Sequence, residues 1–344
     1  MISLKNTKFF ALKSVEFRRY FSSQSCFQTY PYKLFKLDQR PASKVSCTKD
    51  ELLKYYQQMQ TIRKMENLIG NLYSELMGKS SGNVHGKGGS MHMYEEHFYG
   101  GNGIVGAQVP LGGGIALAMK HRKQKNVCFA LYGDGAANQG QVFETMNMAK
   151  LWKLPIVFVC ENNGFGMGTS AERSSASTDY YTRGDYIPGL WVDAMDVLTV
   201  REATKFCKEW CNSGNGPLVM ELHTYRYVGH SVSDPGTSYR KREEVEAVRK
   251  AHDPIRRLKE HLITSNSATQ DEVKKIDKGI QQEIDQALEI VSNDPDLPKE
   301  GVYCDIYSNT NPQLVRGVTF DESIVQPYTT TSQLLQKLGR QLRH

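Results

Sequence analysis

The sequence predicts an α/β protein with a doubly wound, mainly parallel sheet and a helical C-terminal part. Short apolar runs alternate with helical repeats along the middle of the chain, which is the pattern of β-α-β units in a parallel sheet. From about residue 240 the sequence instead carries successive amphipathic helical repeats. The chain has 344 residues, of which 39% are hydrophobic, so it is long and apolar enough to form a folded core.

The first predicted element is a long amphipathic helix. Thr48-Lys49-Asp50-Glu51 form a capping box, and apolar residues then recur at spacings of three or four up to about Met77. The next segment, residues 82–114, contains 11 glycines without the period of collagen. We therefore expect its backbone to pass close to another group.

Alternating helices and strands follow the glycine-rich segment. The predicted order is helix, strand, helix, strand, helix and strand, at residues 108–122, 126–132, 139–152, 155–161, 199–212 and 217–225. Three surface helices come next, at residues 240–252, 253–263 and 269–291, and the last opens with the capping box Thr269-Gln270-Asp271-Glu272.

Positive charge is concentrated at the beginning of the chain. The net charge is +6, and +4 of it comes from residues 1–25, where five basic residues face one acid. The near-neutral remainder argues against nucleic-acid binding, and no apolar run approaches the roughly 18 residues of a membrane span. Residues 1–25 are expected to be a mitochondrial transit peptide, because the run from Arg18 to Ser23 resembles a matrix-protease cleavage site. An ordinary basic tail is the alternative.

Cysteine usage fits a reducing compartment. The seven cysteines are an odd number without Cys-x-x-Cys spacing, so neither a disulfide framework nor a zinc site is predicted.

Polar residues follow the first two predicted strands of the sheet. Gly-Asp-Gly, centred on Asp134, ends the first strand, and Asn-Asn, ending at Asn163, ends the second. The carboxyl ends of neighbouring parallel strands meet at one crevice, so two oxygen ligands would converge there. Asp134, the side chain of Asn163 and a carbonyl such as that of Phe165 would suit Mg²⁺. Gly-Asp-Gly alone indicates a tight turn, but Asn-Asn after the next strand favours the metal site.

These motifs are similar to the thiamine diphosphate signature. Longer stretches resemble the alpha subunits of pyruvate dehydrogenase, in the thiamine diphosphate-dependent 2-oxo acid dehydrogenase family. They are GGSMHM (88–93), YGGNGIVGAQVPLG (99–112), YGDGAANQG (132–140), ENNGFGMGTS (161–170) and YRYVGHSVSDPGTSYR (225–240). The resemblance runs from about Cys47 to Gly317. It implies a thiamine diphosphate-binding α/β domain over residues 47–239, a helical C-terminal part over 240–317 and a divergent tail over 318–344, where residues 332–343 are expected to form a short basic helix.

The resemblance also assigns residues to the cofactor. It implies that Asp134, Asn163 and the Phe165 carbonyl hold Mg²⁺. The diphosphate would accept hydrogen bonds from the amides of Gly135 and Ala136, and the aminopyrimidine would contact the backbone of Gly103 and Val105. Phe165 replaces a tyrosine of the family, an exchange that a carbonyl ligand tolerates.

His230 is similar to the family histidine that reaches the reaction centre beside the cofactor. A lone histidine in a loop is more often only solvated, and it is the matched surroundings that favour a catalytic role. Val228 stands where some relatives carry a second histidine. The resemblance further makes Ser170, Ser231 and Ser238 regulatory phosphorylation sites, and a phosphate near His230 and the diphosphate would disorder the loop by repulsion.

The resemblance implies the oxidative decarboxylation of pyruvate in the mitochondrial matrix, with thiamine diphosphate as the electron sink. The implied partners are a beta subunit in a heterotetramer, the lipoyl domain of the acetyltransferase, and a regulatory kinase and phosphatase. A relative acting on branched-chain keto acids is an alternative, but the stretches GGSMHM and SDPG resemble the pyruvate enzyme more closely.

One departure from the family falls between Tyr73 and Ser74. Relatives carry several tens of residues there, including a Tyr and an Arg that bind the diphosphate, and an Arg–phosphate contact is charge-assisted and bidentate. A splice variant, a gene-model error or a subunit that lost activity would each give this gap. The second hypothesis is therefore a non-catalytic subunit that keeps its partner contacts but does not bind the cofactor.

Overall fold

The computed structural model describes residues 24–68, 75, 77–89, 91–305, 313–316, 323–326 and 329–339. Within these residues the chain forms two compact units. The sheet unit is drawn from Phe21–Arg63 and Asn102–Ile280, and the glycine-rich unit from Lys64–Gly101 and Gln281–His344. The predicted transit peptide, apart from its last two residues, and the junction between Tyr73 and Ser74 lie outside the described residues.

The sheet unit contains most of the regular structure. Its strands are β1 (Ser25–Gln28), β2 (Lys33–Phe35), β3 (Lys44–Cys47), β4 (Cys128–Gly133), β5 (Ile156–Asn162), β6 (Phe165–Gly166), β7 (Thr169–Ser170), β8 (Gly189–Asp193) and β9 (Leu218–His223). Its helices are α2 (Gln108–His121), α3 (Gly140–Leu151), α4 (Ala171–Ser174), α5 (Val197–Asn212), α6 (Arg242–His252) and α7 (Pro254–Thr264). Short 3₁₀ turns span Ala136–Asn138 and Tyr180–Thr182. Helix α1 (Lys49–Leu68) and helix α8 (Gln270–Ser292) begin in this unit.

The central sheet is mainly parallel, as predicted. Its strand order is β2-β8-β9-β5-β4, in which β8, β9, β5 and β4 run parallel and β2 is antiparallel at the edge. Strand β5 is internal and pairs with β4 on one side and with β9 on the other. The α/β fold class is therefore confirmed.

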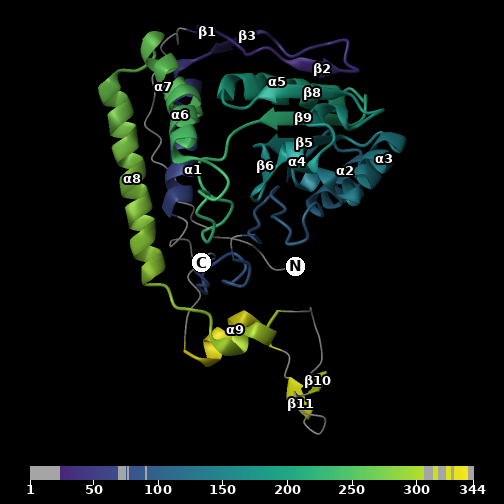
Figure 1. Ribbon diagram of the computed structural model, residues 1–344. Coiled ribbons are helices and arrows are strands. Elements are labelled where there is room, and N and C mark those ends of the chain that lie inside the picture. The colour runs from purple at the N-terminus through teal and green to yellow at the C-terminus, as the bar shows by residue number, and fades with distance from the viewer. Residues whose placement is uncertain are drawn as a thin grey trace. The chain divides into compact units, whose positions relative to one another are not determined.

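Helices cover both faces of this sheet because the side chains of β5 alternate between two cores. Ile156, Phe158 and Cys160 pack with residues of α2 and α3, such as Val109 and Met146. Val157 and Val159 belong to the other cluster, which contains Ala203 and Cys207 of α5. In Figure 1, α5 accordingly lies on the opposite side of the strands from α2 and α3. An unbroken apolar run is what a strand buried on both faces requires.

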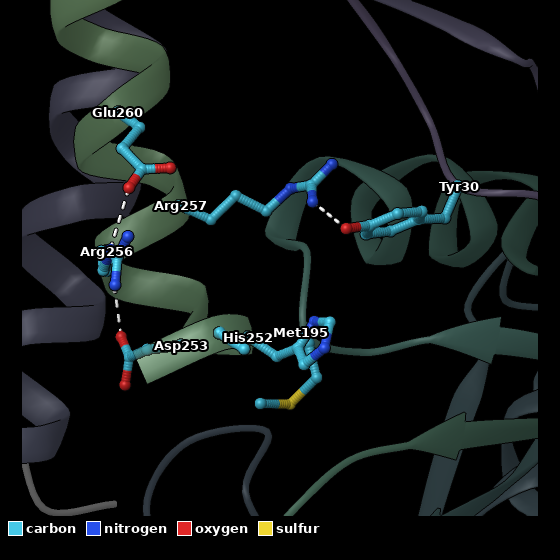
Figure 2. A pocket seen from close by; sticks show the side chains of 8 residues that line it. Tyr30, Met195, His252, Asp253, Arg256, Arg257 and Glu260 are labelled. Carbon is cyan, nitrogen blue, oxygen red and sulfur yellow. Dashed lines mark hydrogen bonds and ion pairs between the residues drawn. The ribbon is translucent and has the colours of Figure 1, made fainter. Parts of the chain in front are cut away.

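A third core lies where the β1–β3 hairpin meets the helices. Its members include Cys47, Tyr56 of α1, Leu198 of α5 and Leu258 of α7, and all are buried. A small cavity of about 60 Å³ opens near this junction, and Figure 2 shows Arg257 reaching from α7 to the hydroxyl of Tyr30. Arg257 also forms an ion pair with Asp196 at 3.2 Å, so the cavity lies among residues that tie the hairpin to the helices.

The glycine-rich unit folds around the carboxylate of Glu75. Its two oxygens accept hydrogen bonds from the backbone amides of Val84, Gly86 and Gly88 at 2.8, 3.0 and 2.6 Å. The remaining elements of the unit are the 3₁₀ turn Lys299–Tyr303, the hairpin of β10 (Gln313–Arg316) and β11 (Ser323–Gln326), and α9 (Thr331–Lys337).

Every helix and strand predicted for the middle of the chain is present, with boundaries shifted by a few residues. The prediction for the first helix was wrong at its end. The helix ends at Leu68, and Glu75 and Met77 lie in turns, because the Glu75 carboxylate binds the amides of the next loop. Strands β1, β2, β3, β6, β7, β8, β10 and β11 were not predicted. Helix α9 overlaps the first half of the helix expected over residues 332–343, of which residues 340–343 lie outside the described residues.

All seven cysteines are free thiols, and only Cys26 is exposed. None of the helices in the described part of the chain combines the length and the apolar character needed to cross a membrane.

Candidate functional site

The carboxylate of Asp134 lies at the carboxyl end of β4. Gly133, the last residue of β4, pairs with Glu161 of β5, so Asp134 lies beside the end of β5. The residue is only 2% exposed. Burial raises the pKa of Asp134, while backbone hydrogen bonds and the charge of Arg226 act in the opposite direction. A second cation beside this buried carboxylate would stabilise its ionised form.

Two asparagines shape the end of β5. The side-chain oxygen of Asn162 accepts from the amide of Gly164 at 3.0 Å, and that of Asn163 accepts from the amide of Phe165 at 3.1 Å. The amide nitrogen of Asn162 donates to Glu221 of β9 at 2.8 Å. Asn162 is thus held in place, and the Asn163 oxygen keeps a second lone pair for another ligand.

Phe165 is the first residue of the short hairpin formed by β6 and β7, which packs against the Gly-Asp-Gly turn. Phe165 of β6 pairs with Ser170 of β7. A Cβ built on Gly135 would lie 3.0 Å from the Cα of Gly166, which is closer than real Cβ contacts normally come. The structure therefore brings the predicted residues Asp134, Gly135 and Phe165, and also Ser170, to one edge of the sheet.

The segment before α2 meets the same turn region. The carbonyl of Val105 accepts from the side chain of Gln141 at 3.0 Å, and Gln141 lies in the first turn of α3. Gly103 and Val105 are exposed. Ala136 is buried and begins the 3₁₀ turn that follows Asp134.

The loop that carries His230 is organised by Asp234. Its carboxylate accepts from the amides of His230 and Gly236 at 2.7 and 2.8 Å and from the hydroxyl of Tyr239 at 2.6 Å. The hydrogen bond from Tyr239, followed by those two amides, lowers the pKa of Asp234 to about 2. His230 itself is exposed.

Arg226 connects this loop to the Phe165 hairpin. Its guanidinium donates to the carbonyls of Phe165 and Met167 at 3.4 and 2.6 Å and to the hydroxyl of Tyr239 at 3.0 Å. The Tyr239 ring lies 5.4 Å from that of Phe165. Because Tyr239 also binds Asp234, a chain of hydrogen bonds runs from the hairpin to the backbone of His230.

The three predicted phosphorylation sites differ in their surroundings. Ser231 and Ser238 are exposed, and the Ser231 hydroxyl lies 3.1 Å from that of Ser233. Ser170 is half-buried, directly before α4. Ser231 and Ser238 are therefore open to a modifying enzyme, and Ser170 less so.

The donor set at the sheet edge fits the predicted cofactor. A buried carboxylate, an amide oxygen and a backbone carbonyl are the oxygen ligands that Mg²⁺ prefers, and few protein ligands are needed when phosphate supplies the rest. No cluster of three His, Cys, Asp or Glu residues able to hold a metal occurs among the described residues. The predicted magnesium site is of a different kind, since it contains a single acid.

The residues that position the site were not predicted from the sequence. Glu221 is 1% exposed, accepts from Asn162 and from the amide of Tyr181, and has its pKa raised by burial. The signal for it was a single acid in the apolar run of β9. Arg226, Asp234 and Tyr239 lay inside a stretch already noted, but only the fold shows which of them meet.

Comparison with known proteins identifies the family. The family model of the dehydrogenase E1 component matches residues 42–300. The chain is 55% identical over 372 aligned positions to the probable pyruvate dehydrogenase E1 component subunit alpha, mitochondrial, of Caenorhabditis elegans, covering 93% of this chain and 94% of the relative. It is 51% identical over 372 positions to the type II subunit of Ascaris suum (93% and 95% covered). With the human somatic form it shares 47% identity over 352 positions (87% and 90% covered).

These alignments are longer than the 344 residues of the chain. The relatives therefore carry residues that this chain lacks. The match to the family model nevertheless spans Asp134, Asn163 and His230. The chain belongs to the dehydrogenase E1 component family, whose members depend on thiamine diphosphate.

Proposed function

We propose that this chain is the alpha subunit of a mitochondrial pyruvate dehydrogenase, which decarboxylates pyruvate oxidatively and transfers the acetyl group to lipoyl-lysine. The observation that carries the proposal is the buried Asp134 beside Asn163, at the ends of two parallel strands, in a chain whose relatives bear that name. The names of the relatives place them in mitochondria, and we assign this chain to the matrix.

The sheet edge would hold the cofactor. Asp134, the side-chain oxygen of Asn163 and the carbonyl of Phe165 would bind Mg²⁺, and the amides of Gly135 and Ala136 would face the diphosphate. Bound thiamine diphosphate supplies the electron sink for decarboxylation. Gly103 and Val105 would support the aminopyrimidine through their backbone.

His230 would act next to the substrate. An imidazole can hold or deliver a proton near neutral pH. Its backbone is fixed by Asp234, which is bound to Tyr239 and through it to Arg226. These residues position the histidine but need not touch the substrate. A phosphate on Ser231, the next residue, would bring about −1.5 to −2 charges to this loop and oppose catalysis.

The working enzyme would need partners. E1 alpha subunits work with a beta subunit, and we propose a heterotetramer that passes the acetyl group to a lipoyl domain of the acetyltransferase. A kinase and a phosphatase would act on Ser170, Ser231 and Ser238. The relatives described above carry pyruvate in their names, so nothing favours a branched-chain substrate.

The test of this proposal uses the family segment that is missing after Tyr73. The full chain, copurified with its beta subunit, is titrated calorimetrically with thiamine diphosphate and Mg²⁺, beside a form with the family segment restored. Loss of one Arg–phosphate contact should weaken binding by about one to two decades. Decarboxylation of pyruvate by either form supports the proposed family activity.

Each outcome separates the hypotheses. Activity in the restored form alone supports a non-catalytic variant of an authentic subunit. Equal affinity and activity in both forms means that the missing Tyr and Arg are dispensable. If neither form binds thiamine diphosphate, the proposed function is wrong.

A further inference from the structure

The 3₁₀ turn that follows β4 is weakly held by its own backbone. It spans Ala136–Asn138, and no side chain caps it. The amide of Asn138 donates to the carbonyl of Gly135 at 3.4 Å, which is near the limit for a hydrogen bond. The amide of Gln139 donates to the carbonyl of Ala136 at 3.0 Å. So short a piece of 3₁₀ helix depends on contacts from outside it to keep its conformation.

Arg183 reaches this turn from a distant segment of the chain. One terminal nitrogen of its guanidinium donates to the side-chain oxygen of Asn138 at 2.6 Å and to the carbonyl of Ala137 at 3.4 Å. The other terminal nitrogen donates to the carbonyl of Ser177 at 2.8 Å. The guanidinium also lies 4.5 Å from the centre of the Tyr180 ring. Arg183 therefore joins the turn to the residues that precede Arg183 in the chain.

Asn138 strengthens the same connection with its other side-chain atom. Its amide nitrogen donates to the carbonyl of Ser174 at 3.3 Å and to the hydroxyl of Ser175 at 3.1 Å. The Ser175 hydroxyl lies 3.0 Å from that of Tyr180, and Tyr180 is only 1% exposed. The turn is thus bound to a segment that is itself fixed in the core.

The segment that carries Arg183 is also tied to the end of β5. The amide of Tyr181 donates to the carboxylate of Glu221 at 2.9 Å, and Glu221 accepts from Asn162 at 2.8 Å. Arg183 follows Tyr181 by two residues, and its side chain holds the turn after β4. A chain of hydrogen bonds therefore connects the ends of the two strands at the proposed cofactor site.

The positive charge of Arg183 is not neutralised by a carboxylate among the described residues. Its acceptors are two carbonyls and one amide oxygen. Burial raises the pKa of the Tyr180 hydroxyl, and the charges of Asp134 and Arg183 act on it in opposite directions. Arg183 and Asp134 therefore lie within electrostatic range of the same hydroxyl. A cation without a counter-charge beside the turn would favour an anion there.

We propose that Arg183 is a positioning residue for the cofactor. It holds the Ala136–Asn138 turn in the conformation that presents the amides of Gly135 and Ala136 to the diphosphate. The inference rests on the proposed function, which assigns the diphosphate to these amides. A guanidinium suits the task because its planar fork directs donors at separate acceptors, whereas the ammonium group of lysine is a point charge on a flexible stem. Arg183 acts through the turn and need not touch the cofactor.

Hydrogen exchange tests the contact without any cofactor. It is measured by mass spectrometry on the chain copurified with its beta subunit, in the absence of thiamine diphosphate. Arg183→Gln should make the amides of residues 135–139 exchange about tenfold faster. Arg122→Gln is the control, because it removes the same charge from an exposed position at the end of α2. Equal exchange of this peptide in the two variants would overturn the inference.

Titration with thiamine diphosphate and Mg²⁺ tests the consequence for the cofactor. Arg183→Gln should weaken binding about tenfold or more. Arg183→Lys should weaken it severalfold, because lysine keeps the charge but loses the fork. At saturating cofactor the kcat for pyruvate should return to that of the unmodified chain, whereas a merely structural role would lower kcat and leave the affinity unchanged. Full affinity in Arg183→Lys would mean that charge alone suffices, and would overturn the positioning role.

Asn138→Ala gives an independent test through the partner of Arg183. In free energy, the combined Arg183→Gln and Asn138→Ala variant should lose less cofactor affinity than the two single losses together, since both substitutions remove one contact. Fully additive losses would show that the two residues act separately, and would contradict the inference.

Failure of this inference can be told apart from failure of the proposed function. The unmodified chain and the form with the family segment restored are titrated in parallel with the variants. If neither binds thiamine diphosphate, the proposed function is wrong and the role of Arg183 falls with it. If they bind it and Arg183→Gln binds it equally well, the function stands and only the role of Arg183 is refuted.

Discussion

Gly135 and Gly166 meet backbone to backbone. A Cβ on Gly166 would lie 3.1 Å from the Cα of Gly135, and the reverse substitution would give 3.0 Å. One glycine follows the buried Asp134, and the other follows the carbonyl proposed as a metal ligand. The contact thus sets the distance between the two halves of the proposed cofactor site, which are the Gly-Asp-Gly turn and the β6–β7 hairpin.

A methyl group at this contact should separate the halves. We expect Gly166→Ala to destabilise the fold by about 1–3 kcal/mol, because backbone atoms must move, and to reduce retention of thiamine diphosphate. Thermal unfolding and cofactor content measure the two effects. Gly140→Ala is the control, since a Cβ there meets nothing within 4 Å. Equal melting temperatures of the two variants would contradict the close approach.

Asp134→Asn tests the proposed metal ligand. The substitution preserves size and removes the negative charge that would face Mg²⁺, so Mg²⁺-dependent affinity for thiamine diphosphate should fall at least tenfold. The fold should survive, because burial disfavours the charged form in the absence of metal. Calorimetry at fixed Mg²⁺ gives the affinity, and an unchanged value would remove Asp134 from the site.

Asp234→Asn tests the organisation of the His230 loop. Asparagine offers one acceptor oxygen where the carboxylate binds three donors, so exchange of the His230 and Gly236 amides should become faster. Hydrogen exchange by mass spectrometry measures this change. Protection equal to that of the unmodified chain would mean that Asp234 does not hold the loop.

The pH dependence of the same loop follows from the lowered pKa. The pKa of Asp234 in the folded chain is about 2, below the ordinary value of about 3.9. The stabilisation of the loop by the ionised Asp234 carboxylate is therefore complete above the ordinary pKa. It is lost as the pH falls from about 4 towards 2. Loop protection corrected for intrinsic exchange should decrease in that window, and a pH-independent value would count against the hydrogen bonds.

Charge mimics distinguish the two exposed serines. Ser231→Glu should lower the pyruvate activity of the assembled enzyme more than Ser238→Glu, because Ser231 adjoins His230. Activity assays on the complex with the beta subunit compare them, with Ser231→Gln as the uncharged control. Equal rates for all three variants and the unmodified chain would argue against a charge-sensitive switch.

The strands and helices around Asp134 could be predicted because their signals are local. An apolar run such as residues 156–160 and a capping box such as that at Thr48 depend only on neighbours in sequence. Strand β8 was missed because Gly189–Asp193 is short, follows a proline and begins with a glycine. It becomes a strand through its pairing with β9, which is a tertiary effect.

The residues of the candidate site also fall into those that local sequence signals predict and those that depend on tertiary contacts. Asp134 and Asn163 were found because strand ends in a parallel sheet have a known meeting point. Glu221 and Arg226 act through contacts with Asn162 and Phe165, about 60 residues away in sequence. Such partners follow from three-dimensional packing, and no spacing rule in the chain points to them.

The antiparallel edge of the sheet has a consequence for the order of folding. Strand β4 joins β5 across one short helix, whereas β2 pairs Lys33 with Trp191. Closing so long a loop costs more entropy than closing a short one. We expect pulse-labelled hydrogen exchange during refolding to protect β5 before β2. Until that edge is paired, β8 would present open backbone groups to other chains, and aggregation during refolding should begin there.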